Sequence, residues 1–492
     1  MPGKFEAPRG GRRPTPRPEQ AGRPEPARRQ EPTRPSVPTR RARRKKRSPL
    51  LVILPALLVL GLSMALLLSR CGGEKKPQDN SIPSASAEAT DAGTLAQPTV
   101  VARATVAAQG DVLMHIYLFT ADPRFPAAYN LGEGNYNFDG IFQYMKPYIS
   151  ELDYSVINLE TTLGGPDYPY QGNPNFNCPD PLADSLAGAG YDMLLTANNH
   201  CADTTVAGLK RTLEQVRSRN LTALGTQLND QEKKYEVVDI NGIKVGMFCY
   251  TYAGGLESDG SPNLNLNAQT IVREAGVVNY FTVSNLDRLY SETQEILTAM
   301  KEEGAEATML FIHWGTEYEL TQDATQSAIA QRMCDLGIDV IVGGHPHVVQ
   351  PMDLLTSTAD PEHKTVCIYS LGNAVSNQRR EEIKSMPTGH TEDGAMFTVT
   401  FEKDSEGTVR VSETEVIPTW VNKFVNGDGK VEYNLLPLDD STRSQWQSLY
   451  GLTDATAAEL PASYDRTMAI VGPGLSKCKE YLSGSPAPAM AQ

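Results

Sequence analysis

Two histidines two residues apart, His345 and His347, have the types and spacing in this chain that most directly suggest chemistry. They follow an apolar run, residues 337–341, that is typical of a buried strand. Two glycines permit a sharp turn just after that run, and Pro346 fixes the backbone between the two rings. Neutral imidazole is a common ligand for zinc, manganese or iron. Taken alone, the pattern fits a metal site or two loop histidines that bind no metal.

Polar side chains of metal-ligand type recur at the same kind of place, just past the carboxyl ends of predicted strands. These residues are Asp111, Glu160, Asn199, His200, His313, His345 and His347. Because the strand ends of an α/β sheet open onto one crevice, we expect these side chains to converge. Buried charges need partners, and a pair of divalent cations would partner this set. Carboxylate oxygens beside imidazoles suit manganese, iron or zinc, and the pattern does not choose among them.

A pair of such ions supports one kind of reaction. Two metals about 3.5–4 Å apart stabilise both the attacking and the leaving oxygen of an in-line displacement, and one carboxylate can bridge them. Metal-bound water would then be the nucleophile. His200 follows the proposed ligand Asn199 directly, and it is therefore the candidate to protonate the leaving group.

Strands and helices must alternate to bring these residues together, and the hydrophobic pattern predicts that they do. Strands are expected at residues 104–109, 154–157, 191–196, 308–312, 337–341 and 365–369. Helices are expected at residues 138–152, 179–189, 204–219, 285–303 and 325–336. Hairpins are expected at residues 235–251, around Asn241-Gly242, and at residues 396–416. This order predicts an α/β domain with helices packed on sheets.

The charge of the chain is unevenly distributed. The net charge is −14 over 492 residues, but residues 1–49 carry 16 Lys+Arg against 4 Asp+Glu, a balance of +12. The remaining residues carry 29 against 55, a balance of −26, which argues against nucleic acid as a partner. Seven scattered cysteines exclude a cysteine-rich zinc module and a disulfide-stapled miniprotein.

The N-terminal region predicts a membrane anchor. Residues 1–49 form a basic Pro/Arg-rich tail that cannot bury enough surface to fold. Residues 50–68 are uncharged and mostly apolar, long enough to span a bilayer, and the basic residues before them predict a cytoplasmic N-terminus. A cleaved signal peptide is the rival interpretation, but the nearest Ala-x-Ala, at residues 85–87, lies far downstream. We therefore expect a single-pass protein of the cell membrane, with its folded domain extracellular.

The rest of the chain divides into three parts. Residues 69–100 predict a flexible linker, and residues 101–438 the folded domain. Residues 439–492 predict a helical and disordered C-terminal extension, with a helix near 463–471 that the Gly-Pro-Gly at 472–474 should end. Cys178 and Cys201 lie near predicted cleft loops, and whether they form a disulfide stays open.

Six short motifs in order give the chain a family resemblance. They are Gly110-Asp111-Val112-Leu113-Met114-His115, Asn158-Leu159-Glu160, Ala197-Asn198-Asn199-His200, His313-Trp314-Gly315-Thr316-Glu317, Gly344-His345-Pro346-His347-Val348-Val349-Gln350-Pro351 and Tyr369-Ser370-Leu371-Gly372-Asn373. Together they resemble the CapA family of poly-γ-glutamate capsule synthesis, over roughly residues 104–420. That family is similar to the calcineurin-like metallophosphoesterases. The resemblance therefore implies a sandwich of two mixed β-sheets flanked by helices, behind the N-terminal transmembrane helix.

The resemblance also implies a role for each site residue. Asp111 and His347 would hold the first metal ion, and Glu160 would bridge to the second. The second ion would be held by Asn199, His313 and His345. His200 would be the general acid.

One departure concerns the first metal. Phosphoesterases usually begin with Asp-x-His, whereas Leu113 stands two residues after Asp111 here. His115 is either a replacement ligand or an exposed loop histidine.

Three further residues are assigned to the cleft or to the support of the metal ligands, namely Asn198, Glu317 and Asn373. Glu317 either orients a histidine or caps the next helix. Asn373 either shapes the cleft rim or forms a structural turn.

Three functions follow as hypotheses. The first is a membrane-anchored CapA-like protein that acts in the synthesis or export of poly-γ-glutamate or a related surface polymer. Its cleft would be that of a metal-dependent hydrolase or transferase with two divalent ions. The second is a general extracellular phosphodiesterase or phosphatase that acts on phosphoesters. The third is a non-catalytic subunit of a polymer-export complex, which implies partner subunits in the membrane.

Overall fold

The computed structural model describes residues 99–265 and 270–484. The predicted basic tail, the predicted transmembrane segment and nearly all of the predicted linker lie outside the described residues, as do residues 485–492. Among the helices that are described, none is both long enough and apolar enough to cross a membrane.

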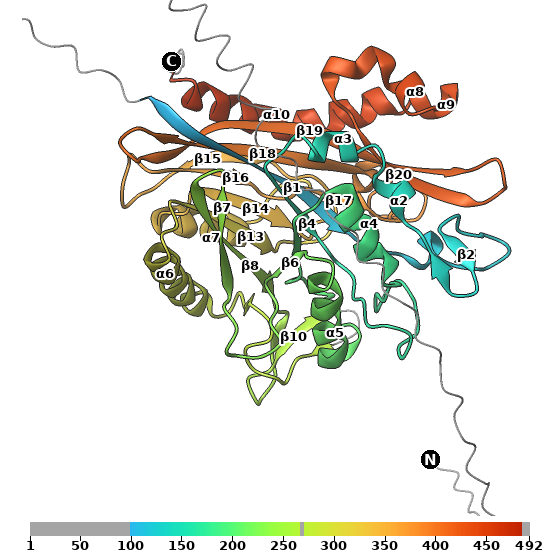
Figure 1. Ribbon diagram of the computed structural model, residues 1–492, viewed down its shortest axis with the longest axis horizontal. Coiled ribbons are helices and arrows are strands. Elements are labelled where there is room, and N and C mark those ends of the chain that lie inside the picture. The colour runs from blue at the N-terminus through green and yellow to red at the C-terminus, as the bar shows by residue number, and fades with distance from the viewer. Residues whose placement is uncertain (1–98, 266–269, 485–492) are drawn as a thin grey trace, which may run out of the picture. The chain divides into compact units, whose positions relative to one another are not determined.

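The first β-sheet is eight-stranded and carries several of the predicted site residues (Figure 1). Its strands run in the order β20 (Val431–Pro437), β19 (Val409–Val425), β18 (Asp393–Asp404), β1 (Val100–Val112), β4 (Tyr154–Asn158), β5 (Met193–Leu195) and β6 (Thr222–Leu224), and β17 (Asn373–Val375) pairs with the end of β1. β1, β4, β5 and β6 are parallel, whereas β18, β19 and β20 are antiparallel. The sheet is therefore mixed.

The second β-sheet is seven-stranded and also mixed. Its strands run in the order β12 (Tyr280–Phe281), β8 (Ile243–Tyr252), β13 (Ala307–His313), β14 (Val340–Gly344), β16 (Lys364–Ile368) and β15 (Met352–Thr356), and β7 (Tyr235–Ile240) pairs with β8. β7 and β8 form the predicted hairpin, and both turn residues, Asn241 and Gly242, have positive φ as a tight type I′ turn requires.

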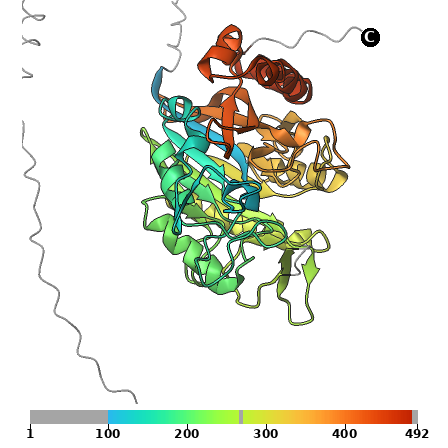
Figure 2. The same cartoon turned by 90° about the vertical axis from the view of Figure 1, so that its right-hand side faces the viewer.

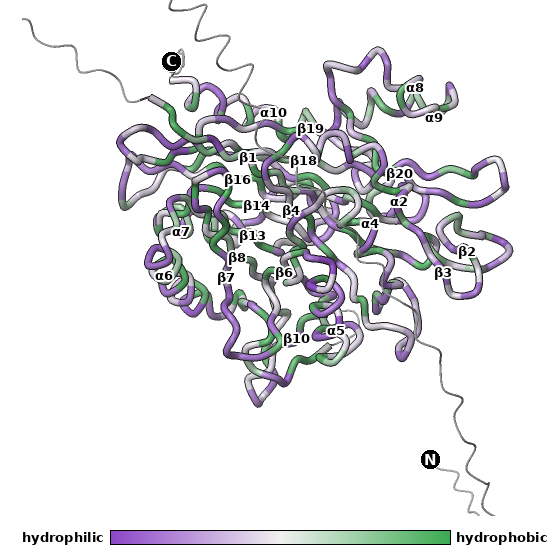
Figure 3. Tube along the Cα trace, in the orientation of Figure 1, coloured by the Kyte–Doolittle hydropathy of each residue, from purple (hydrophilic) through white to green (hydrophobic). Residues whose placement is uncertain are grey.

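The two sheets pack face to face around a common core. Alternate residues of β1, Ala104, Val106 and Ala108, lie in this core together with Met247 and Met309 from the second sheet. The intervening residues of the strands face outward into separate clusters, because successive side chains of a strand point to opposite faces. Figure 3 shows this pattern as hydrophobic stretches along β8, β13 and β14.

Helices cover the outer face of each sheet. The helices on the first sheet are α2 (Asp139–Phe142), α3 (Lys146–Ile149), α4 (Pro181–Ala189) and α5 (Thr205–Arg217). Those on the second sheet are α6 (Leu286–Glu302) and α7 (Ala324–Asp335). The described part of the chain is therefore a two-sheet sandwich flanked by helices, which confirms the predicted architecture at this level.

The C-terminal region packs onto the sandwich. It contains η4 (Asp440–Gln445), α8 (Trp446–Leu449), α9 (Asp454–Ala457) and the long α10 (Leu460–Leu482), drawn in red in Figure 2. α10 contacts β19 of the first sheet and β15 of the second, and Val471, Leu475 and Cys478 enter the core between the sheets. The predicted break at residues 472–474 is wrong, because α10 continues through Pro473. Packing against β15 and β19 holds the helix together at this position.

A second prediction was also wrong. The single helix expected at residues 138–152 is divided into α2 and α3, with a turn between them. Pro147 explains the division, because it lacks the N–H that would bond to the carbonyl of residue 143 in a continuous helix. The remaining short elements are η2 (Ile116–Leu118), β2 (Asn130–Gly132), β3 (Asn135–Tyr136), β9 (Gly255–Leu256), β10 (Pro262–Asn265), β11 (Thr270–Ile271) and η3 (His390–Glu392).

Candidate metal centre

Two groups of buried ligand-type side chains lie side by side at the carboxyl ends of the parallel strands. One group is Asp111, Glu160 and His347, and the other is Glu160, His313 and His345. Within each group one ligand atom per residue lies within 4.8 Å of the others. Glu160 belongs to both groups, so its carboxylate lies between two candidate ion positions. This is the arrangement that the sequence predicted, with one shared carboxylate between two sets.

The first group is assembled across both sheets. Asp111 comes from the end of β1, whereas His347 follows β14. Nδ1 of His347 lies 3.4 Å from Oδ2 of Asp111 and 3.9 Å from Oε2 of Glu160. Asn158, the last residue of β4, donates from Nδ2 to Oδ1 of Asp111 at 2.7 Å and fixes that carboxylate. Asn158 is a site residue that the sequence interpretation missed, although its place at a strand end was a usable signal.

The second group includes an amide oxygen. Nε2 of His313, at the end of β13, lies 3.3 Å from Oε1 of Glu160 and 2.8 Å from Oδ1 of Asn199. His345 completes the group, and its ring lies 4.8 Å from that of His313 between centroids. Asn199 therefore places a neutral oxygen beside two imidazoles and a carboxylate, and its role as a metal ligand stays a prediction.

The residues present fit a pair of divalent cations. Both carboxylate oxygens of Glu160 and Nδ1 of His345 are buried and accept or donate no hydrogen bond. A buried carboxylate without a hydrogen-bond partner is costly, and a bound cation would supply the missing partner. The donor set of carboxylates, imidazoles and an amide suits manganese, iron or zinc.

The backbone that carries His345 and His347 is strained in a way that aims both rings at the centre. Their φ angles are 98° and 56°, in the left-handed region that non-glycine residues rarely adopt. Gly343 permits the close approach before them, because a Cβ there would overlap the carbonyl oxygen of Tyr369. Gly343, His345 and His347 thus each have a structural reason for their place in this turn.

The electrostatics of the two groups differ. Burial lowers the pKa of His345 well below its usual value, and His313 and His347 add to the effect, so this ring is neutral and able to bind a cation. Burial also opposes the charged form of His347, but Glu160 and Asp111 outweigh it and raise the pKa of His347 to about 9. Burial would raise the pKa of Asp111, yet the His347 hydrogen bond and the nearby histidines keep it below its usual value.

His200, the predicted general acid, is buried beside the centre and is held by a carboxylate. Its Nδ1 lies 2.8 Å from Oδ2 of Asp203, three residues later. The Phe176 N–H donates to the same oxygen at 2.6 Å, which fixes the carboxylate. Burial opposes the charged ring, but Asp203 outweighs it and raises the pKa of His200. The sequence interpretation did not assign a role to Asp203. An aspartate three residues after a histidine is common, and only the fold places this carboxylate against the His200 ring.

His115 lies apart from both groups. Its Nδ1 lies 3.1 Å from the Leu113 carbonyl oxygen and 3.2 Å from the Asn377 backbone nitrogen. Its ring packs edge-on against Phe176, which packs in turn against His200. His115 therefore packs near His200, through Phe176, and is not part of either ligand group. Leu113 is buried in the core.

The remaining predicted residues support the ligands. Asn198 donates to Oδ1 of Asn158 at 3.2 Å and to a backbone carbonyl at 2.9 Å, and its own oxygen accepts from the His200 N–H. Oδ1 of Asn373 lies 3.2 Å from Nδ1 of His347. Glu317 is partly exposed, and its negative charge favours the protonated form of His347. Asn198 and Asn373 thus orient other side chains, and Glu317 lies at the rim.

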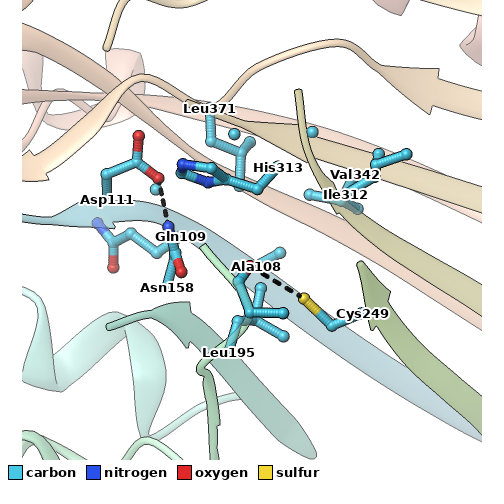
Figure 4. A pocket seen from close by; sticks show the side chains of 14 residues that line it. Ala108, Gln109, Asp111, Asn158, Leu195, Cys249, Ile312, His313, Val342 and Leu371 are labelled. Carbon is cyan, nitrogen blue, oxygen red and sulfur yellow. Dashed lines mark hydrogen bonds between the residues drawn. The ribbon is translucent and has the colours of Figure 1, made fainter. Parts of the chain in front are cut away.

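A small cavity of about 20 Å³ lies behind the centre, between the two sheets. Asp111, Asn158 and His313 line it on the side of the ligand groups, and Leu195 and Cys249 line it on the core side (Figure 4). The space is sufficient for about one water molecule. The candidate metal centre therefore borders a mostly apolar cavity.

Cys178 and Cys201 are both buried and free, so the disulfide that the sequence left open is not formed. Burial raises the pKa of the Cys201 thiol to about 12. Neither residue belongs to the ligand groups of the described part of the chain.

Comparison with known proteins gives a consistent picture. Residues 105–378 match the family model described as bacterial capsule synthesis protein PGA_cap, and this range contains every residue of both ligand groups. The PGA biosynthesis protein CapA of Bacillus subtilis (strain 168) is 26% identical over 285 residues, which cover 56% of this chain and 65% of that protein. The capsule biosynthesis protein CapA of Bacillus anthracis is 27% identical over 252 residues, which cover 49% of this chain and 55% of that protein.

The chain thus spans less than two thirds of the length of either relative. The family model nevertheless matches more than half of the chain, and it confirms the resemblance that the strand-end motifs carry. The chain therefore belongs to the family of bacterial capsule synthesis proteins PGA_cap.

Proposed function

We propose that this chain is a membrane-anchored capsule synthesis protein whose cleft holds two divalent metal ions. It would act in the synthesis or export of poly-γ-glutamate or a related surface polymer, as a hydrolase or transferase with the calcineurin-like metallophosphoesterase fold. The observation that carries this proposal is the Glu160 carboxylate, which is buried, lacks a hydrogen-bond partner and is shared by two ligand groups.

Each residue would have a defined task in such a cleft. Asp111 and His347 would hold one ion, His313, His345 and Asn199 the other, and Glu160 would lie between them. When bound, a metal pair supplies Lewis acidity and activates water for attack. His200, oriented by Asp203 at 2.8 Å, would donate its proton to the leaving group. The buried histidines exclude bulk water and strengthen every charge interaction inside the cleft.

The proposed location follows from the sequence before residue 99. The N-terminus would be cytoplasmic, residues 50–68 would cross the membrane, and the folded domain would lie outside the cell. Other subunits of a polymer synthase or export complex are the proposed partners. A body with a balance of −26 repels an anionic polymer, so polymer contact would be confined to the cationic, metal-loaded cleft.

The test uses His345→Ala in the full-length chain, expressed in a strain that lacks its own copy of the gene. Metal content of the purified protein and polymer on the cell surface are measured together. His363→Ala is the matched control, because this histidine contacts the carbonyl of Ile338, near the opposite end of β14. We expect His345→Ala to lose both metal and polymer and His363→Ala to keep both.

The other outcomes separate the alternatives. If His345→Ala kept both metal and polymer, the proposal would be wrong. If the variant lost metal but still produced polymer, the cleft would be dispensable and a non-catalytic role in an export complex would be favoured. Turnover of bis(4-nitrophenyl) phosphate that is lost in His200→Ala, together with unchanged polymer, would favour a general phosphodiesterase.

A further inference from the structure

One cation close to the metal centre has no acidic partner. Lys423, on β19, makes a single hydrogen bond, from Nζ to Oδ1 of Asn377 at 2.7 Å, and no carboxylate of residues 99–265 or 270–484 lies within ion-pair distance of it. Its neighbours Arg379 and Arg380, in contrast, both pair with the buried Glu392. An ammonium group carries three donors, so Lys423 keeps donors available for an incoming acceptor.

The position of Lys423 is fixed by its surroundings. Asn377 accepts from Lys423 and, at 2.6 Å, from the hydroxyl group of Tyr433, its cross-strand neighbour on β20. The ammonium group lies 5.7 Å from the ring centroids of both Tyr117 and Tyr433. Lys423 is half-buried. Of the two tyrosines near its ammonium group, Tyr433 is buried and Tyr117 is 40% exposed, so solvent reaches this place on the Tyr117 side.

This position is close to the candidate metal centre. The segment from Asn373 to Asn377 begins beside Nδ1 of His347 and ends at Lys423. Four peptide units join Asn373 to Asn377, so their Cα atoms are at most about 14 Å apart. A second connection runs from the backbone N–H of Asn377 to His115, whose ring packs on Phe176 beside the proposed general acid. The separation of the two places is therefore within the length of one short oligomer.

We propose that Lys423, with Tyr117 and Tyr433, forms an anion subsite that binds a carboxylate of the polymer while a neighbouring linkage lies at the metal centre. This inference rests on the proposed function, because it takes the substrate to be an anionic polymer. It assigns Lys423 to substrate positioning and not to the reacting atoms.

Charge and burial favour an anion at this place. A half-buried ammonium group without an acidic partner is poorly stabilised, and an incoming carboxylate would form a charge-assisted hydrogen bond with it. Burial and Arg379 lower the pKa of Lys423, and the carboxylates of Glu381, Glu382 and Glu392, which lie beyond ion-pair distance, offset this only in part. The described body is strongly acidic, so an available cation beside the cleft also gives an anionic polymer a preferred direction of approach.

The experiment measures binding of a γ-linked hexaglutamate to the full-length, manganese-loaded chain in detergent. Lys423→Met removes the charge and keeps the length of the side chain, and Lys423→Arg keeps the charge. Lys479→Met is the matched control. Lys479 lies on α10 and pairs with Glu415 of β19, and its loss changes the net charge equally. We expect about tenfold weaker binding for Lys423→Met, since one charge-assisted hydrogen bond is lost.

The companion variants define the expected pattern. Lys423→Arg should bind within about threefold of the wild type, and Lys479→Met should match it, because only the first position faces the ligand. Metal content and thermal melting of Lys423→Met should equal those of the wild type. A γ-linked hexaglutamate in which every α-carboxylate is converted to an amide should bind the wild type and Lys423→Met equally weakly.

Four results would overturn the inference. Equal affinity of Lys423→Met and the wild type for hexaglutamate would remove the subsite and leave the metal-centre proposal intact. A loss of affinity that also occurred in Lys479→Met would show a general charge effect. Tripolyphosphate bound more tightly than hexaglutamate, with the same dependence on Lys423, would assign the subsite to phosphate, and failure of the wild type to bind hexaglutamate at all would overturn the substrate class itself.

Discussion

Replacement of Glu160 by glutamine tests the shared carboxylate directly. The substitution keeps the size of the side chain and removes one charge from a residue that is fully buried and belongs to both ligand groups. Neither carboxylate oxygen accepts a hydrogen bond, and its protein contacts are limited to the ion pairs with His313 at 3.3 Å and His347 at 3.9 Å. The loss should therefore appear almost entirely in metal binding.

The expected size follows from linkage between binding and folding. An ion present at about 1,000 times its dissociation constant stabilises the folded state by about 4 kcal/mol, so two ions give about 8 kcal/mol. For a folded unit of this length, 1 kcal/mol corresponds to roughly 1 °C in melting temperature. The wild type should therefore gain about 8 °C on metal loading, and Glu160→Gln less than half of that.

The assay is thermal melting of both proteins in EDTA and in excess MnCl₂. In EDTA the variant should be no less stable than the wild type, because an amide is cheaper to bury than a carboxylate without a hydrogen-bond partner, by about 1–3 kcal/mol. Asp339→Asn is the control, a partly buried carboxylate just before β14 that accepts from the N–H and hydroxyl of Thr308. This control should lose the same stability with and without metal. An equal metal-induced shift in Glu160→Gln and the wild type would refute the reasoning.

Three further predictions concern the general acid and the C-terminal helix. Asp203→Asn should lower turnover of bis(4-nitrophenyl) phosphate by about 10²-fold, with metal content unchanged, because the carboxylate that orients the proposed acid is lost. Turnover equal to that of the wild type would contradict the assignment. Gly474→Ala should destabilise the protein by more than about 2 kcal/mol in urea unfolding, since its Cβ would overlap a β15 carbonyl, whereas Gly472→Ala, with open space, should stabilise it by about 0.5–1 kcal/mol. Arg466→Met should cost about 3–5 kcal/mol, because it leaves the buried Asp393 carboxylate, which it contacts at 2.7 and 2.8 Å, without its cation; a loss below 1 kcal/mol would contradict this.

The convergence of the ligand groups could be predicted from the sequence, because parallel strands bring their carboxyl ends to one edge of the sheet. Asp111, Glu160, His313 and His345 each follow or end a short apolar run, and that position alone predicted their convergence. The register between the strands and the burial of the charges were then supplied by the fold. The same rule also pointed to Asn158, which was part of a motif but was not assigned a role.

The features that the sequence did not reveal depend on tertiary contacts. Asp203 matters only because Phe176 and the loop before α4 turn its carboxylate toward His200. α10 survives Pro473 because both sheets of the sandwich contact it, which outweighs the local preference for a break. Lys423 stands in an exposed-looking stretch of β19, and only the three-dimensional arrangement shows that it lacks an acidic partner and lies close to the cleft.

The most direct test of the central claim is the count and coupling of metal ions. The full-length chain is loaded with Mn²⁺, washed free of loosely bound metal, and examined by elemental analysis and electron paramagnetic resonance. We predict two ions per chain with an exchange-coupled spectrum in the wild type, and loss of the coupled signal in Glu160→Gln. One uncoupled ion per chain, or none, in the wild type would contradict a dinuclear centre built around the shared carboxylate.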